Sequence, residues 1–164
     1  MAFGLKAGLV PAVLAPIILT SMLLAAGPAR AGNIESLAAR AKAAESKGQF
    51  DDAVMLLQSA VVAAPARAQG YVALGDLYAR HGDVQSAHKY YDEALYLEPG
   101  LPAALEGAGK ADLALGDRKA AQDKLERLAR VCGPDCPAAA KLNAALAAAD
   151  KTGTDAASTS LDKP

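Results

Sequence analysis

Two cysteines are the residues of this sequence best suited to covalent chemistry. Cys132 and Cys136 are its only cysteines, and Gly133 and Pro134 between them favour a turn that brings the two Cα atoms within bridging distance. In an exported protein an isolated, closely spaced pair favours a disulfide. Free thiols, a redox pair and a metal site remain alternatives, although the spacing differs from the C-x2-C redox motif and no adjacent histidine completes a zinc site.

The two histidines do not suggest a metal centre. His81 and His88 would need further ligands that the neighbouring sequence does not supply. His81 precedes Gly82, where a cation would interact favourably with the C-terminus of a helix. The sequence also lacks a nucleophile elbow, a phosphate-binding loop and the H-E-x-x-H zinc motif. It therefore predicts no enzyme, no bound metal and no cofactor.

A 34-residue period runs through most of the chain, and the helices that it predicts would position the cysteines and histidines. The period is carried by three glycines, each followed five positions later by an alanine: Gly48, Gly82 and Gly116, then Ala53, Ala87 and Ala121. Each glycine can end one helix in a left-handed conformation, and the next residue can cap another helix, so that every repeat is a helix pair. The alanines would lie where the two helices cross. Such a period is typical of stacked helical repeats.

The period predicts three repeats over 34–67, 68–101 and 102–135. Pro65 and Pro99 end the second helix of the first two repeats, and Asn33 is suited to cap the first helix. An Ala/Leu-rich helix over 137–150 follows. The last segment, 151–164, has almost no large apolar residue and is expected to be disordered.

The middle repeat resembles the tetratricopeptide pattern at every signature position. The matching residues are Tyr71, Leu74, Gly75 and Tyr78, followed by Ala87, Tyr91, Ala94 and Pro99, with Tyr71 in place of tryptophan and Tyr91 in place of phenylalanine. The resemblance implies an all-α fold in which three repeats form a right-handed superhelix and 137–150 caps it. It also implies a concave groove, lined by the first helices, that holds a peptide or a partner helix.

When the groove positions of the family are transferred to this sequence, they hold small apolar side chains together with charges of both signs. The candidate groove residues are Glu35, Lys42, Glu45, Gln69, Val72, Asp76, Glu106, Lys110 and Leu113. Lys42, Asp76 and Lys110 share one column of the repeats, so an extended ligand would meet charges of alternating sign. The lysine, asparagine and arginine clamp that some members use for chaperone carboxylates is absent, because its positions hold Ala38, Lys42, Ala73, Ala103 and Gly107.

The first 31 residues have the layout of a secretory signal peptide. Lys6 precedes an apolar stretch that ends in Ala29, Arg30 and Ala31, an A-x-A site. A retained membrane anchor is the alternative, although Pro11 and Pro16 disfavour a regular span. These features predict an exported protein, in a bacterial periplasm and free of the membrane after cleavage.

Composition and repeats together favour a binding role. The net charge is −1, with 17 basic and 18 acidic residues, so the chain has no electrostatic footprint for nucleic acid. We expect a scaffold module that binds a protein or peptide in its groove. The alternative is a structural or chaperone-like auxiliary subunit of an envelope complex that docks through other surfaces.

Cleavage after Ala31 is the first testable consequence. Intact-mass spectrometry of the exported protein should find Gly32 at its N-terminus, because the small residues before it fit the signal peptidase site. An unprocessed 1–31 segment recovered in the membrane fraction would contradict this prediction and favour the anchored form.

Overall fold

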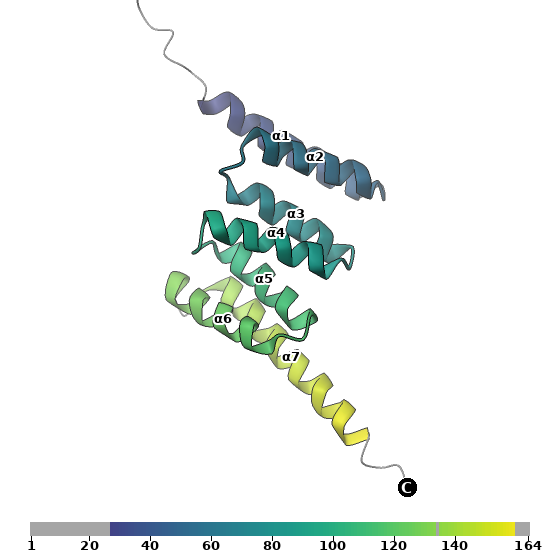
Figure 1. The fold of residues 1–164 in the computed structure, drawn as a ribbon, viewed down its shortest axis with the longest axis vertical. Coiled ribbons are helices and arrows are strands. Elements are labelled where there is room, and N and C mark those ends of the chain that lie inside the picture. Colours follow the sequence, from purple (N-terminus) through teal and green to yellow (C-terminus); the bar gives the residue numbers. More distant parts are fainter. Residues whose placement is uncertain (1–26, 134, 160–164) are drawn as a thin grey trace, which may run out of the picture.

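The computed structural model describes residues 27–133 and 135–159, and the side chains of 34–133 and 135–151 among them. The described residues contain seven α-helices and no strand: α1 (Gly27–Glu45), α2 (Phe50–Ala63), α3 (Ala68–Arg80), α4 (Val84–Leu97), α5 (Pro102–Ala114), α6 (Arg118–Cys132) and α7 (Pro137–Thr159). Figure 1 shows three helix pairs stacked along the long axis of the molecule, with α7 following the last pair and projecting beyond it. The predicted all-α fold is confirmed.

The turns inside the pairs follow the 34-residue period. Gly48, Gly82 and Gly116 have φ angles of 75°, 80° and 86°. Glycine adopts this left-handed conformation at little energetic cost. At Gly82 it allows the backbone N–H of Asp83 to donate to the carbonyl oxygen of Tyr78 at 3.0 Å, which closes α3. The carboxylate of Asp83 then accepts the N–H of Ser86 and begins α4, as Asp117 does at α6. Gln49, the equivalent residue before α2, makes no such cap.

Small residues allow the helices of each pair to approach closely. Ala53, Ala87 and Ala121 are all fully buried, as the period predicts. A second close approach lies between pairs, where Tyr91 of α4 passes between Gly75 of α3 and Gly107 of α5. A Cβ atom at either glycine would overlap the tyrosine ring. The spacing of the stack is therefore set by alanine and glycine positions.

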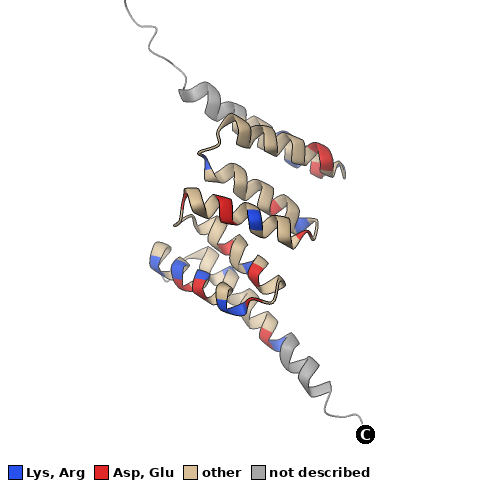
Figure 2. Cartoon of the chain, viewed as in Figure 1, with Lys and Arg blue, Asp and Glu red and all other residues tan. Residues whose placement is uncertain are grey.

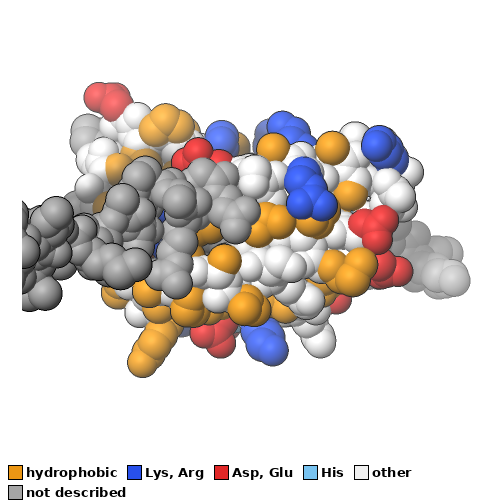
Figure 3. Space-filling view, turned by 90° about the horizontal axis from the view of Figure 1, so that it is seen from above, with side chains coloured by type: hydrophobic (Ala, Val, Ile, Leu, Met, Phe, Trp, Pro, Cys, Tyr) orange, Lys and Arg blue, Asp and Glu red, His pale blue; other side chains and the backbone are white. Residues whose placement is uncertain are grey.

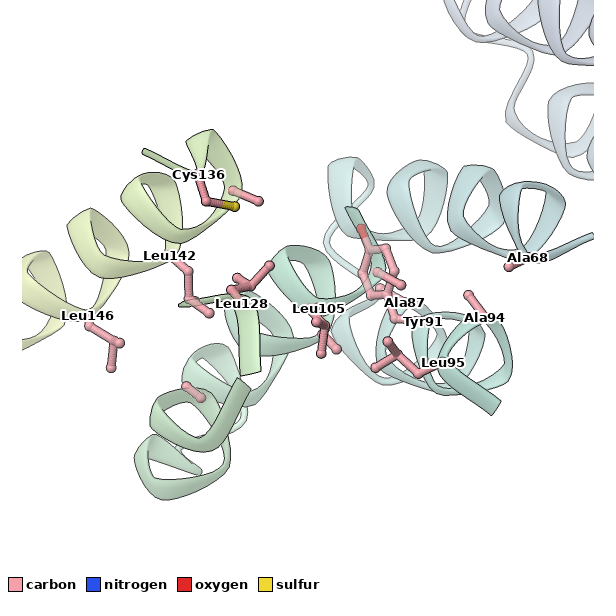
Figure 4. Packing of buried hydrophobic residues seen from close by; sticks show 14 residues of the cluster. Ala68, Ala87, Tyr91, Ala94, Leu95, Leu105, Leu128, Cys136, Leu142 and Leu146 are labelled. Carbon is pink, nitrogen blue, oxygen red and sulfur yellow. The ribbon is translucent and has the colours of Figure 1, made fainter. Parts of the chain in front are cut away.

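The cap α7 is part of the core. Leu105, Leu128 and Leu142 are fully buried where α5, α6 and α7 meet (Figure 4). Leu142 lies directly against Gly109, where a Cβ atom would overlap it. Burying a leucine contributes about 1.5–3 kcal/mol, so α7 stabilises the last pair by covering its apolar face. Charged residues of both signs instead follow α6 on its exposed side (Figure 2).

Both ends of the helical stack extend further than the sequence predicts. α1 begins at Gly27, so Asn33 lies inside the helix and does not cap it. α7 continues past Asp150 to Thr159, whereas the sequence predicts a disordered tail over 151–164. The alanines of this segment favour a helix even without large apolar contacts. The predicted signal peptide falls mostly on 1–26, outside the described residues, and no described helix is long and apolar enough to cross a bilayer.

Cys132 and Cys136 form a disulfide between the end of α6 and the start of α7. Their Cα atoms lie 5.4 Å apart, and Gly133 between them has a φ of 77°. The bridge thus joins the last repeat to the cap.

We expect the double change Cys132→Ser and Cys136→Ser to lower the free energy of unfolding by about 2 kcal/mol, because only a short loop is closed. Hydrogen exchange should accelerate in α7 and leave α1 to α4 unchanged, since stacked repeats contact only their neighbours. Reduced wild-type protein is the control and should behave in the same way. Equal acceleration in all helices would contradict a local role for the bridge.

Candidate functional site

Helices α1 and α3, which are the first helices of repeats one and two, enclose a pocket of about 370 Å3, here called the α1–α3 pocket. Its apolar residues are Ala38, Ala41, Leu57, Ala73 and Leu77. Its charged residues are Lys42, Glu45, Asp76 and Arg80. An apolar pocket with a few polar groups at its edge is the usual form of a binding site.

A bidentate ion pair joins the two helices that form this pocket. Nε and Nη2 of Arg80 donate to the two carboxylate oxygens of Glu45, at 2.7 and 2.9 Å. The Arg80 hydrogen bond holds the pKa of Glu45 below its ordinary value, and the nearby charge of Lys42 acts in the same direction. The glutamate side chain is 19% exposed and the arginine side chain 55%. The pocket therefore presents its cation to solvent more than its anion.

Tyr91 fixes the second carboxylate of the pocket. Its hydroxyl donates to Oδ1 of Asp76 at 2.7 Å, from a side chain that is otherwise buried. Burial, followed by the hydrogen bond to Asp76, raises the pKa of the phenol well above its ordinary value. Tyr91 therefore stays neutral and acts as a hydrogen-bond donor.

A second pocket, the α3–α5 pocket, lies one repeat further along the stack. Its volume is about 220 Å3. The lining residues are Ala79, Val84, Ala87, Tyr91, Gly107, Lys110, Ala111 and Ala114. Lys110 is ion-paired with Glu106, whose other oxygen lies 3.7 Å from Nζ of Lys141 in α7. The two pockets and these flanking charges are referred to below as the groove.

The structure brings most of the predicted groove residues together. Lys42, Glu45 and Asp76 line the α1–α3 pocket, Lys110 lines the α3–α5 pocket, and Glu106 is paired with Lys110. The other four line neither pocket: Glu35, in the middle of α1, and Gln69, near the start of α3, are exposed, whereas Val72 and Leu113 pack against the core. The last two are apolar and half-buried, so they face the neighbouring helix.

Arg80 and Tyr91 were not among the predicted groove residues. Arg80 lies one helical turn after Asp76, a spacing that could have suggested a charge on the same face. Tyr91 occupies a column that usually holds phenylalanine, and a buried hydroxyl requires a partner. Neither of these sequence patterns identifies Glu45 as the partner of Arg80, because the two residues are 35 positions apart in the chain.

A buried polar cluster lies between α4, α5 and α6. Asp112 is 3% exposed, and its carboxylate oxygens lie 2.7 Å from Nε2 of His88 and 2.6 Å from Nζ of Lys124. Nδ1 of His88 lies 3.3 Å from Asp92. Among the described residues no group of three metal-ligating side chains occurs. The cluster is a polar network that joins repeats two and three.

One repeat earlier, the same three columns hold Val54, Tyr78 and Tyr90. Tyr78 stacks on Tyr90, with ring centroids 5.4 Å apart, and packs edge-on against Phe50 at 5.6 Å. Tyr90 is therefore partly buried, and Tyr96 is the tyrosine that reaches the surface, at 84% exposure. The two junctions thus use different chemistry in equivalent positions.

A further hollow lies outside the groove, on the outer face of α1 and α2. It measures about 460 Å3 and is lined by residues that include Arg40, Ala43 and Met55. Figure 3 looks onto this end of the stack, where apolar and charged side chains are mixed. In repeat two the positions of Arg40 and Ala43 hold the buried residues Leu74 and Leu77, which pack against repeat one. The hollow is thus the uncovered stacking face of the first described pair.

Comparisons with known proteins agree with this architecture. A family model described as tetratricopeptide repeat matches residues 38–102. The probable biofilm formation methyltransferase WspC of Pseudomonas putida is 39% identical over 113 residues, which cover 65% of this chain and 26% of that protein. Because the chain spans about a quarter of that relative, the relative's name carries no activity over to it.

Solved structures share the fold at low sequence identity. The first TPR of Spaghetti (RPAP3), bound to the HSP90 peptide SRMEEVD, has a TM-score of 0.62 at 19% identity and covers 71% of this chain and 95% of its own. The Yersinia enterocolitica type III secretion chaperone SycD, in complex with a peptide of the translocator YopD, has a TM-score of 0.63 at 17% identity, with 74% and 95% covered. These likenesses establish the arrangement of helices.

The Arg80–Glu45 pair has a testable pH dependence. Because its folded pKa lies below the unfolded value, Glu45 contributes stability above the unfolded pKa that is lost as the pH falls through the folded pKa. Arg80→Ala should return the pKa of Glu45 toward 4.5, as followed by carboxyl NMR titration. The stability change should stay within about 1 kcal/mol, since the arginine is largely exposed. Arg130→Ala, which removes an exposed pair to Glu126 on α6, is the control and should not move the Glu45 titration.

Proposed function

Because this chain belongs to the tetratricopeptide repeat family, we propose that it is a protein-interaction module whose groove binds a peptide or helix of a partner protein. The observation that carries the proposal is the succession of two pockets along the first helices, formed by residues of all three repeats. Two of the structural neighbours are complexes with a bound peptide. The α3–α5 pocket is lined mainly by small apolar residues, and three alanines line the α1–α3 pocket beside its charged residues, which leaves room for ligand atoms.

The proposal includes a setting outside the cytoplasm. It is supported by the signal-like sequence of 1–31 and by the Cys132–Cys136 disulfide, a bond that persists in oxidising compartments. A bacterial periplasm fits both features, with N-terminal membrane anchoring as the alternative.

A second candidate function is that of a structural or chaperone-like auxiliary subunit that docks through the second helices. It is favoured by Val62 and Tyr96, which share a repeat column at the ends of α2 and α4 and are 80% and 84% exposed. Large exposed apolar side chains in register are compatible with a docking surface.

Filling the α3–α5 pocket separates the two functions. Ala79 is exposed and lines this pocket, so Ala79→Trp should fill it without disturbing the core. In a selection from a random peptide library, we expect the wild-type protein to enrich peptides that bind Ala79→Trp at least about tenfold more weakly, a loss of about 1.4 kcal/mol.

The matched control is Ala129→Trp, which adds the same side chain at an exposed position of α6 outside both pockets. It should retain every enriched peptide. If the wild-type protein enriches no peptide over Ala79→Trp, while Val62→Ser and Tyr96→Ser abolish association with envelope proteins, the docking alternative replaces the groove.

A further inference from the structure

The two pockets of the groove are repeat-related copies with different chemistry. Six lining residues of the α1–α3 pocket correspond, 34 positions later, to lining residues of the α3–α5 pocket: Glu45 to Ala79, Leu57 to Tyr91, Ala73 to Gly107, Asp76 to Lys110, Leu77 to Ala111 and Arg80 to Ala114. The two pockets therefore lie on the same side of the stack. A ligand that runs along the first helices meets them in succession.

The residue differences between these equivalent positions make the α1–α3 pocket charged and the α3–α5 pocket smaller and more apolar. The Glu45–Arg80 pair of the first pocket is replaced by two alanines in the second. The volume falls from about 370 to about 220 Å3, where the larger Tyr91 stands in place of Leu57. The pockets therefore cannot prefer the same ligand side chain.

The accessible charge of the groove is positive. One cation comes from each of four helices: Lys42 of α1, Arg80 of α3, Lys110 of α5 and Lys141 of α7. The side chains of the last three are 55%, 44% and 63% exposed. Their carboxylate partners are more deeply placed, with Glu45 at 19% and Glu106 at 16% exposure.

The carboxylates of the groove already have hydrogen-bond or ion-pair partners within the protein. Arg80 binds both oxygens of Glu45, and Tyr91 donates to Asp76. Both oxygens of Glu106 face lysines, Lys110 and Lys141. Lys42 forms no ion pair with any described residue, although its charge acts on Glu45. An incoming ligand thus finds spare N–H donors and few free acceptors.

We propose that the groove binds an acidic segment of a partner protein, with a carboxylate at the α1–α3 pocket and a small aliphatic side chain in the α3–α5 pocket. This inference rests on the proposed function and specifies the partner's chemistry. Arg80 and Lys42 receive the carboxylate, while Asp76, held by Tyr91, repels an acidic residue that binds out of register. The charged first pocket and the apolar second pocket together set the direction of the bound segment.

The test uses peptides that the wild-type protein enriches from a random library. They should carry an excess of aspartate and glutamate together with alanine or valine. Binding of a labelled enriched peptide, followed by fluorescence anisotropy, should weaken as salt is added, because the cations are exposed. Replacing its small aliphatic residue by lysine should weaken binding, since the second pocket is lined by apolar side chains together with another cation, Lys110.

Two charge-reversal variants make the matched comparison. Lys42→Glu with Lys110→Glu should lower the affinity at least about tenfold. Lys89→Glu with Lys119→Glu changes the net charge equally on the second helices and should leave the affinity within about twofold, since distant surface charges are screened. The pairs are matched, because Lys110 and Lys119 each bind a carboxylate one helical turn away, whereas Lys42 and Lys89 form no ion pair with a described residue.

The outcomes distinguish this inference from the function on which it rests. Enriched peptides that are basic or neutral, or equal weakening by the two double variants, would overturn the acidic-ligand inference alone. Failure of the wild-type protein to enrich any peptide over Ala79→Trp would overturn the proposed function as well.

Discussion

The close approach of helices at alanine and glycine positions is the constraint on which the rest of the structure depends. A single helix pair leaves one apolar face uncovered, so each pair must stack on the next. Ala53, Ala87 and Ala121 are fully buried inside the pairs, and Gly75 and Gly107 admit Tyr91 between pairs. A larger side chain at any of these positions would separate the helices. Two of these small residues, Ala87 and Gly107, also line the α3–α5 pocket.

The junctions between repeats are not interchangeable, although they share one geometry. Tyr78 stacks on Tyr90 at the first junction, whereas His88, Asp112 and Lys124 form a polar network in the same columns at the second. Burying charges costs desolvation energy that ion pairs only partly recover, so the polar junction adds less stability than an apolar one would.

The groove illustrates how tertiary contacts change the meaning of a sequence column. Lys42, Asp76 and Lys110 share a column, and by sequence they form a row of alternating free charges. In the structure Asp76 accepts the Tyr91 hydroxyl and Lys110 is paired with Glu106. The more exposed charges are consequently those of the cations, and Arg80, which was not among the predicted groove residues, lines the α1–α3 pocket.

The sequence by itself determined the helix pairs, their turns at Gly48, Gly82 and Gly116 and the buried alanines, and it favoured a disulfide between Cys132 and Cys136 without excluding free thiols. These features depend on local backbone preference and on a period that repeats in the chain, so they can be read without coordinates. Only the tertiary structure decided that Arg80 binds Glu45, that Tyr91 holds Asp76 and that Val72 and Leu113 turn to the core. Such contacts join side chains on different helices whose relative rotation is set by packing, and no spacing within one helix encodes that rotation.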